Sequence, residues 1–380
     1  MERNFKRFGI KNWIDNGWEV KIFDVTKIVS PDFYSYVDGK KISFNFEGLK
    51  CFNKIDELLS TINNLQNKVV FIDLLGFSNK CNTIRKFVKV HGVMVRLRLG
   101  SFPQDKFKKN PLEIIKLALN PIIFVNKLIS FSKRIVVNYK KSNVNSDYLV
   151  VGGTQSYSDI NEKKTLIIKA HNFDYDFFIE NKHVKSNKNS KFLVFLDEDA
   201  AYHSDYKKLA ISPFVKAENY YPVIDNGLNK IAKSLNLNIK IAAHPRSNYD
   251  NKLFKFKFST FKNKTFELIK DADIVVAHTS TSMQYAVLLK KPIILVTTDE
   301  IQKASYAKYF KHIINSFASV LGKKVINFND LSNLHNFEDY LNVDHKKYDL
   351  YIEKFIKTKK SPEKKLWNIV IERIERDLFF

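Results

Sequence analysis

Side chains suited to binding an anion gather in one short stretch of the chain, residues 273–296. An apolar run, Ile274 to Ala277, ends at His278. Four consecutive hydroxyl residues follow it: Thr279, Ser280, Thr281 and Ser282. Hydroxyls and unpaired backbone N–H groups at the start of a helix bind phosphate oxygens. One hydroxyl is enough to cap a helix, so a run of four favours a phosphate site over a simple cap.

A second group suited to anions, His244-Pro245-Arg246, follows the apolar run Ile239 to Ala243. Histidine donates an N–H to a phosphate oxygen, arginine offers a bidentate fork, and proline fixes the backbone between them. The alternative is an ordinary turn at the end of a strand. Because both groups follow strands of one predicted α/β unit, we expect them to lie at the same edge of its sheet.

Carboxylates at two further strand ends are candidates for a general base, which removes a proton from an acceptor hydroxyl. Asp197 and Glu198 follow the run Phe192 to Leu196, with His203 close behind as another donor-binding candidate. A solvated acidic turn is the alternative interpretation of these carboxylates.

The other carboxylates, Asp174 and Asp176, follow the strand predicted for Thr165 to Ala170, together with His171. Asp-x-Asp is a metal–nucleotide motif in some sugar transferases, yet it is short enough to arise by chance. If the phosphate lies on the second half of the chain, a base from the first half or from the hinge is favoured. That selects Asp174 or Asp176, with Asp197 and Glu198 as competitors and His171 as an orienting group.

Several well-known motifs are missing from the sequence. Residues 152–156, Gly-Gly-Thr-Gln-Ser, follow a strand but lack the GxGxxG pattern of dinucleotide sites. The chain contains neither GxxxxGK[ST] nor GxSxG, which argues against a P-loop nucleotidase and an α/β-hydrolase. We expect no metal and no cofactor.

The elements that must position these groups alternate between helix and strand. In the first half, helices are predicted at 3–16 and 54–66, and strands at 19–25, 69–75, 92–97, 148–152 and 165–170. In the second half, strands are predicted at 192–196, 239–243, 274–277, 293–296 and 324–328, and helices at 219–235, 266–270, from 283, and 303–320. Two last helices are expected within 347–378, split near Ser361-Pro362. This alternation is typical of α/β proteins with mostly parallel sheets.

A polar stretch, residues 181–191, is the best linker in the sequence. We therefore predict an N-terminal Rossmann-like domain at 1–185, a second at 190–345, and closing helices at 346–380, with a cleft between the two domains.

The composition indicates an anionic partner, since the 380 residues carry a formal net charge of +23. The lysines are spread along the chain without a recognition motif, so we do not expect nucleic acid. Two cysteines without Cys-x-x-Cys spacing, and the lack of an apolar leader, predict a cytoplasmic protein. The apolar segment 111–136 has two interpretations, a pair of buried helices broken at Pro121 or a segment on an anionic membrane surface.

The His-Pro motif and the downstream Ser/Thr motif resemble those of GT-B glycosyltransferases, in particular the bacterial sialyltransferase-like enzymes. The resemblance implies a CMP-activated acidic sugar as donor, with His244 and Ser280 to Ser282 on the donor phosphate. The FLDE, AHPR and STS patterns are similar to proteins of bacterial surface-polysaccharide synthesis, such as capsule, O-antigen or lipopolysaccharide. The sialyltransferase acidic motif ends in Gly, whereas here Ala200 follows Asp199.

The leading hypothesis is an inverting, metal-independent glycosyltransferase (EC 2.4 class) that moves a sugar from a nucleotide donor to a glycan or lipid-linked glycan. Peripheral association with the inner face of the plasma membrane fits this hypothesis. One alternative is a glycerophosphotransferase of the CDP-glycerol type, because the 271–292 region also resembles teichoic-acid enzymes. A second is a non-catalytic basic protein that binds glycan or lipid.

Overall fold

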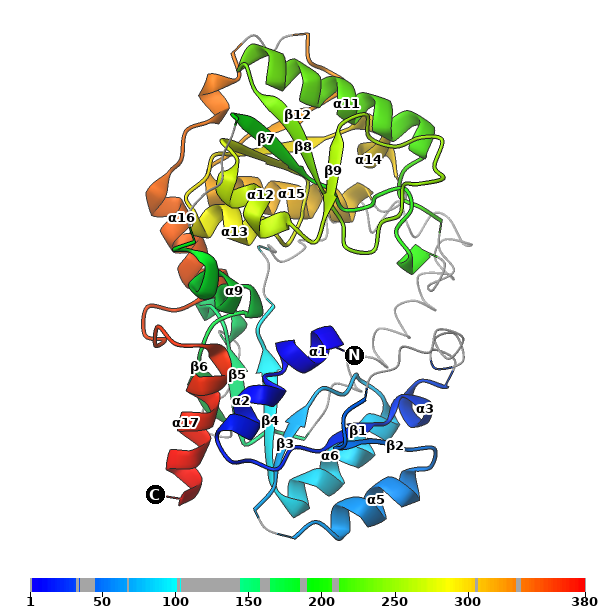
Figure 1. Ribbon diagram of the computed structural model, residues 1–380, viewed down its shortest axis with the longest axis vertical. Helices are drawn as coiled ribbons and strands as arrows, with labels where there is room; N and C mark the ends of the chain where they lie inside the picture. Colours follow the sequence, from blue (N-terminus) through cyan, green and yellow to red (C-terminus); the bar gives the residue numbers. More distant parts are fainter. Residues whose placement is uncertain are drawn as a thin grey trace, which may run out of the picture. The chain divides into compact units, whose positions relative to one another are not determined.

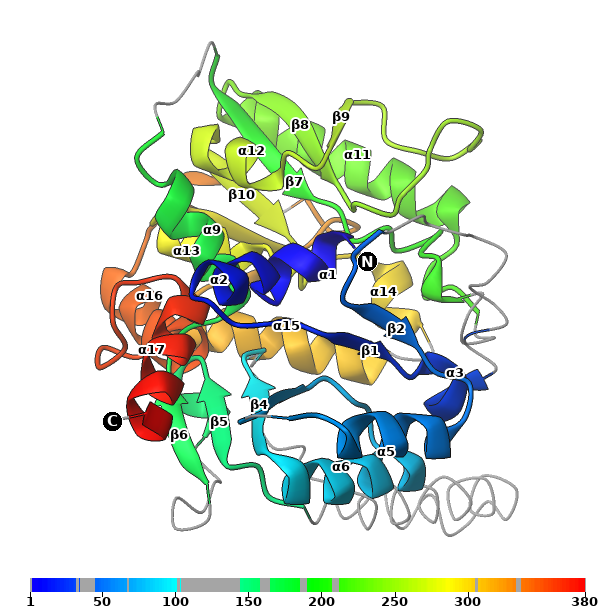
Figure 2. The same cartoon turned by 60° about the horizontal axis from the view of Figure 1, so that its bottom comes forward.

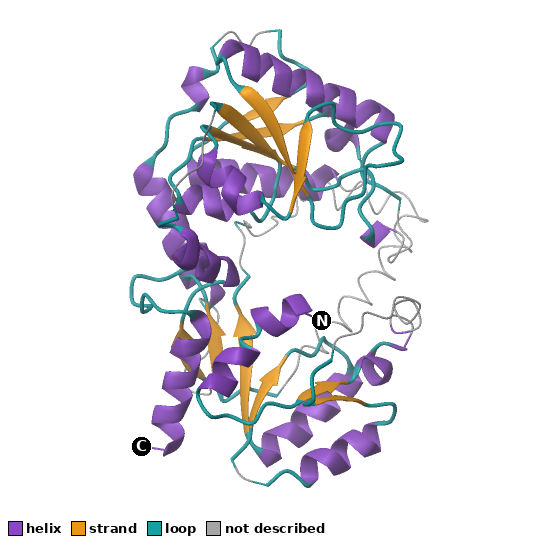
Figure 3. Ribbon diagram, in the orientation of Figure 1, coloured by secondary structure: helices purple, strands orange, loops and turns teal. Residues whose placement is uncertain are grey.

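The computed structural model is drawn by element in Figure 1 and by secondary structure in Figure 3. It describes residues 2–31, 34, 45–66, 68–100, 103, 144–157, 165–184, 190–206, 212–304, 307–332 and 336–379. The segment 111–136, with its two interpretations, lies outside the described residues. In the part of the chain that is described, no helix combines the length and apolarity needed to cross a bilayer.

The chain forms two compact units. The first contains the described residues before Ser101, residues 144–173 and the chain from Lys359 onward, and the second contains Pro103 and residues 174–358. The division therefore falls at 173–174 and at 358–359, whereas the sequence analysis placed domain borders at 185–190 and 345–346. Of the predicted linker, residues 185–189 lie outside the described part.

The first unit is built on a parallel sheet in the order β3 (Val70–Asp73), β4 (Val93–Arg98), β5 (Tyr148–Val151) and β6 (Leu166–Lys169). A separate parallel pair joins β1 (Ile22–Asp24) to β2 (Leu49–Cys51). The helices are α1 (Glu2–Arg7), α2 (Ile10–Asp15), α3 (Thr26–Val29), α5 (Ile55–Asn63), α6 (Asn79–His91) and α17 (Leu366–Phe379).

Helices cover both faces of this sheet. Side chains of α2 and α17 pack on one face beside Val95 and Val150, and those of α5 and α6 pack on the other beside Met94. The helix predicted over 3–16 is broken at Gly9, whose φ of 61° lies in the left-handed region. A Cβ there would lie 2.2 Å from the Trp367 ring, so the close approach of α17 requires glycine.

The second unit contains a larger parallel sheet with the strand order β12-β11-β10-β7-β8-β9. Its strands are β7 (Phe192–Leu196), β8 (Asn238–Ala243), β9 (Ser259–Lys262), β10 (Ile274–Ala277), β11 (Ile293–Thr297) and β12 (Val325–Asn327). Its helices are α9 (Phe173–Asn181), α11 (Ala217–Ser234), α12 (Thr265–Asp271), α13 (Met283–Leu288), α14 (Asp299–Lys303), α15 (Ala307–Leu321) and α16 (His345–Tyr351). Figure 2 shows the same unit from a second direction.

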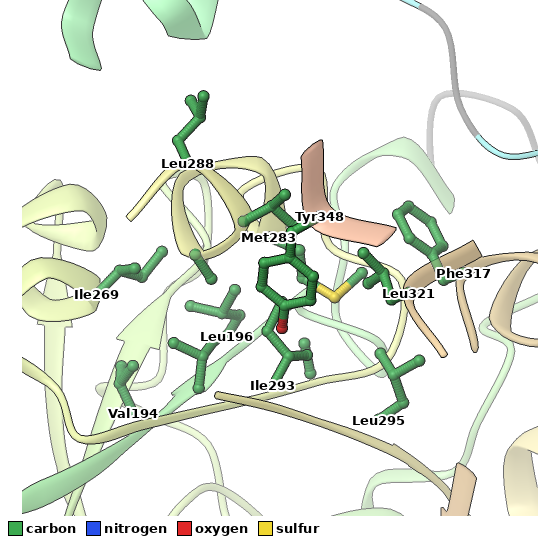
Figure 4. Close-up of a cluster of buried hydrophobic side chains, with 14 of the residues drawn as sticks. Val194, Leu196, Ile269, Met283, Leu288, Ile293, Leu295, Phe317, Leu321 and Tyr348 are labelled. Carbon is green, nitrogen blue, oxygen red and sulfur yellow. The ribbon is translucent and has the colours of Figure 1, made fainter. Parts of the chain in front are cut away.

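Alternation along the strands divides the core of this unit into two layers. Val194 and Leu196 of β7 face one layer, which contains side chains of α12, α13 and α15 and is drawn in Figure 4. Leu193 and Phe195 face the other layer, under α11. The strands β7, β10 and β11 are nearly continuous apolar runs, as expected for a parallel sheet covered on both faces, whereas β8 carries Asn238 and Lys240 and the edge strand β9 is mostly exposed.

The predicted α/β class is confirmed, and each unit is a parallel sheet between helices. The C-terminal region splits as expected, but its two helices belong to different units, α16 to the second and α17 to the first. The sequence analysis missed α3, α6, α9, α14, β2 and β9. Nothing described bears on a cleft between the units, so the cleft stays a prediction.

Candidate functional site

The second unit has a topological switch point between β7 and β10. From β7 the chain adds β8 and β9 on one side of the sheet and then β10, β11 and β12 on the other. The chain that leaves the carboxyl end of β7 therefore leads to one side of the sheet, and the chain that leaves β10 leads to the other. Ligands of open α/β sheets bind at such a point. Most of the predicted site residues lie in the loops after β7, β8 and β10.

Asp197, the first residue after β7, is a buried carboxylate that accepts hydrogen bonds from two loops. Its Oδ1 accepts the backbone N–H of Asp199 at 2.9 Å, and its Oδ2 accepts the backbone N–H of His244 at 3.3 Å and the Tyr249 hydroxyl. Burial raises the pKa of Asp197, although these hydrogen bonds oppose the shift. The carboxylate thus holds the loop after β7 against the loop after β8.

Glu198 joins the loop after β7 to the loop after β10. Its Oε1 accepts the backbone N–H of Thr279 at 2.6 Å, and its Oε2 accepts the Thr279 hydroxyl at 2.9 Å. Burial raises the pKa of Glu198 to about 7. Glu198 keeps partial solvent exposure, and a pKa near neutrality suits a group that exchanges a proton. The polar groups of Thr279 that were predicted to bind phosphate already have a protein partner.

Asp199 is a strained residue that the sequence analysis did not select. Its φ of 55° is left-handed, which is uncommon for a residue other than glycine. The side chain is buried, and its Oδ1 has no hydrogen-bond partner among the described residues. Burial, and then the charge of Asp197, raise the pKa of Asp199 to about 7. Such strain tends to persist at functional sites.

The loop after β8 supplies the cationic part of the site. Arg246 forms a bidentate pair with Asp205, with Nη1–Oδ1 at 2.8 Å and Nη2–Oδ2 at 3.3 Å. Its Nη2 also lies 3.2 Å from Nε2 of His203. The rings of His203 and His244 are 4.8 Å apart between centroids. The structure therefore brings His203, His244 and Arg246 into one cluster, with Pro245 exposed between the last two.

His244 presents a hydrogen-bond donor to this cluster. Burial, and then the nearby His203 and Arg246, lower the pKa of His244 to about 4, so the ring is neutral near pH 7. Its Nδ1 accepts the backbone N–H of Arg246 at 3.3 Å, which leaves the proton on Nε2. That Nε2–H has no hydrogen-bond partner among the described residues. It is suited to donate to a phosphate oxygen.

The hydroxyl turn after β10 divides into a buried and an accessible part. His278 lies in the core, where its Nδ1–H donates to the Val296 carbonyl at 2.6 Å and its Nε2 accepts from the Tyr220 hydroxyl at 2.9 Å. Burial lowers the pKa of His278 to about 4. Both ring nitrogens are occupied, so we leave His278 out of the proposed donor site.

The remaining hydroxyls of the turn are more accessible. The Ser280 hydroxyl accepts the backbone N–H of Ser282 at 3.4 Å. Thr281 is exposed, Ser282 is half-buried, and neither hydroxyl has a hydrogen bond to the described residues. These two hydroxyls can therefore bind a ligand.

The other predicted residues do not belong to the loops after β7, β8 and β10. Asp174 and Asp176 are in the first turn of α9, within the second unit, and Asp174 Oδ1 accepts the Tyr285 hydroxyl of α13 at 3.3 Å. His171 belongs to the first unit and is fully buried. Its Nδ1 lies 2.9 Å from the Asn172 carbonyl, and its Nε2 lies 2.9 Å from the Lys364 carbonyl.

Sequence reasoning also missed Asp205 and Tyr249, which hold Arg246 and Asp197. The His-x-Asp spacing of His203 and Asp205 was the available signal for the first. For Tyr249 there was none, because its contact with Asp197 depends on how the loop after β8 folds back.

We find no protein-family model that matches the chain and no curated protein that matches it. Solved structures of similar fold include the UDP-GlcNAc 2-epimerase of Methanocaldococcus jannaschii in complex with UDP-GlcNAc and UDP, with 15% identity over 97% of this chain and 94% of that chain and a TM-score of 0.42. The wall teichoic acid polymerase TagF is 14% identical over 97% of this chain and 85% of that chain, with a TM-score of 0.48. The calicheamicin glycosyltransferase CalG4 is 10% identical over 91% and 89%, with a TM-score of 0.42. At these identities the likeness concerns the fold alone.

Proposed function

We propose that the protein is a glycosyltransferase that moves a sugar from a nucleotide donor to a glycan or lipid-linked glycan acceptor. The observation that carries the proposal is the convergence of His203, His244 and Arg246 beside the switch point of the second sheet. The cluster offers the Nε2–H of a neutral His244 to a nucleotide phosphate, beside the positive charge of Arg246, whose guanidinium Asp205 holds in place. The hydroxyls of Thr281 and Ser282 are the further ligands that we assign to the donor.

In this proposal the sugar leaves the donor phosphate as the acceptor oxygen attacks its anomeric carbon. The bond between that carbon and the phosphate oxygen breaks, and negative charge grows on the phosphate. His244 and Arg246 stabilise the departing phosphate, and their effect is greatest when that charge is fully developed. The acceptor hydroxyl loses its proton to a carboxylate, and the outcome is inversion.

Among the candidate bases, Glu198 is the one the geometry favours. It is half-buried, it lies at the same sheet edge as His244, and its pKa of about 7 suits proton transfer at neutral pH. Asp197 is buried and bound by Tyr249 and two backbone N–H groups. Asp174 and Asp176 lie on α9, and they remain the alternatives if the acceptor approaches from that side.

The test is steady-state turnover with CMP-, UDP- and GDP-sugars on glycan acceptors, a CMP-activated acidic sugar being the donor that we favour. His244→Ala should lower kcat by about 100-fold or more, the usual cost of removing one donor to the charge of a transition state. His345→Ala, which changes an exposed histidine on α16, is the matched control and should keep wild-type turnover. Wild-type turnover in His244→Ala would refute the proposed donor site.

The pH profile tests the base. Glu198 must be deprotonated to act, so kcat/KM should fall as the pH drops through about 7. Glu198→Gln should remove both this limb and most of the activity. An unchanged limb in Glu198→Gln would reassign the base. We expect turnover to persist in EDTA, and its loss would point instead to a metal held near Asp174 and Asp176.

Two alternatives are separated by the same assays. Turnover of CDP-glycerol in place of a nucleotide sugar would identify a glycerophosphotransferase. Salt-sensitive binding of glycan or lipid, with no turnover of any donor, would identify a non-catalytic binding protein.

A further inference from the structure

The loop between β8 and β9 carries an exposed apolar tip. Leu253 is 88% exposed, more than any other large apolar side chain in the part of the chain that the structure describes. Its neighbour Phe254 is 36% exposed. Single exposed apolar residues are common on protein surfaces. Two adjacent ones at the tip of a loop form a small protruding surface that water solvates poorly.

Cations surround this tip. Lys252, Lys255 and Lys257 are all exposed. Asp250 is the only acidic residue in the sequence from Ser247 to Lys262. The ammonium groups of Lys255 and Lys257 form no ion pair with any residue whose placement is described. The tip therefore combines two exposed apolar side chains with lysines on both sides of them in the sequence.

Two hydrogen bonds fix the backbone on either side of Leu253. The Lys252 N–H donates to the Tyr249 carbonyl at 3.1 Å, and the Tyr202 hydroxyl donates to the Phe254 carbonyl at 2.9 Å. Phe256 points the opposite way and is buried in the core under α11. Phe256 anchors the loop in that core, which limits how far the backbone of Leu253 can move toward the unit.

We propose that this tip, Lys252 to Lys257, docks the second unit on an anionic membrane surface. Leu253 and Phe254 would enter the boundary between headgroups and acyl chains, while the lysines contact acidic headgroups. An aliphatic side chain at the point of the loop finds no partner on a nucleic-acid backbone, which favours a lipid surface. The loop begins just after the His244–Arg246 turn, so docking would hold that turn near the membrane. The proposal stands whether or not the protein transfers sugar.

The test places a reporter at the tip of the full-length protein. Leu253→Trp is mixed with vesicles of phosphatidylcholine and phosphatidylglycerol, and the emission of the unaltered protein, with its three native tryptophans, is subtracted. We expect a saturable blue shift that weakens at high salt. Leu350→Trp is the matched control, because Leu350 is an exposed leucine of the same unit but lies beside Asp349. Its emission should not change.

Partition is then measured by co-sedimentation with the same vesicles. Lys255→Ala and Lys257→Ala should each weaken partition about fivefold. Leu253→Glu combined with Phe254→Glu should weaken it by about tenfold or more. Circular dichroism checks that each variant is folded, and the Leu253→Trp emission keeps the test independent of the double variant.

Four outcomes would overturn the proposal. The first is no blue shift with anionic vesicles, and the second is an equal shift with phosphatidylcholine alone. The third is a shift produced by RNA or an acidic polysaccharide in place of vesicles. The fourth is a shift that appears with rising protein concentration alone, which would show that a second copy covers the tip.

Discussion

Three consecutive carboxylates, Asp197, Glu198 and Asp199, show what a sequence reveals at the scale of single residues. Their place after a buried strand predicted a polar strand end, and the structure has them there. Their different roles depend on contacts far along the chain, with Tyr249 for Asp197 and Thr279 for Glu198. The left-handed backbone of Asp199 has no specific sequence signal, because aspartate adopts this conformation only occasionally. The position of these carboxylates at a strand end was therefore predictable, and their hydrogen-bond partners were not.

This view predicts a stability gain from Asp199→Asn. The folded protein raises the pKa of Asp199 to about 7, so its carboxylate costs stability as the pH rises from its unfolded value through 7. Asparagine carries no charge and tolerates the left-handed backbone. At about pH 8 the variant should be more stable by about 1–3 kcal/mol, the cost of an unsatisfied buried polar group. At about pH 5 the advantage should shrink.

Urea unfolding at the two pH values measures this difference. Asp250→Asn, an exposed aspartate of the same unit, is the control and should change stability little at either pH. A destabilised Asp199→Asn at the higher pH would show that Asp199 holds the loop rather than straining it.

At the scale of elements, hydrophobic periodicity located most strands of both sheets. The buried strands β7, β10 and β11 are continuous apolar runs, and their ends fall where the sequence places them. The edge strand β9, Ser259–Lys262, was missed because its exposed positions leave no apolar pattern. Helix α9 was missed because its polar first turn looked like a loop motif.

Close packing between elements gives a second prediction. Gly227 of α11 faces Phe328, and a Cβ at that position would lie 2.2 Å from the ring. Gly227→Ala should therefore destabilise the second unit by about 1–3 kcal/mol, although alanine favours helices. Gly76→Ala adds a Cβ that meets nothing within 4 Å and should be nearly neutral. Thermal unfolding compares the two, and equal melting temperatures would contradict the packing.

At the scale of the whole molecule, the sequence predicted two α/β units but not which segments complete each one. The C-terminal helix α17 packs with Trp13 and Val150 in the first unit, a contact between distant parts of the chain that no local pattern encodes. The second unit is different, since both of its core layers come entirely from residues 175–356. Residues 174–358 should therefore fold as a separate fragment with a cooperative unfolding transition.

The residues of the proposed donor site lie within that fragment, and this gives the most direct test of the central claim. Isothermal titration of residues 174–358 with CMP, UDP and GDP should show saturable binding of at least one nucleotide, matching the affinity of the full chain within a few-fold. His244→Ala should weaken that binding by about tenfold or more, the scale of one hydrogen bond to a charged group, while His345→Ala should not. A folded fragment that binds none of the three, or binds equally well after His244→Ala, would contradict the account.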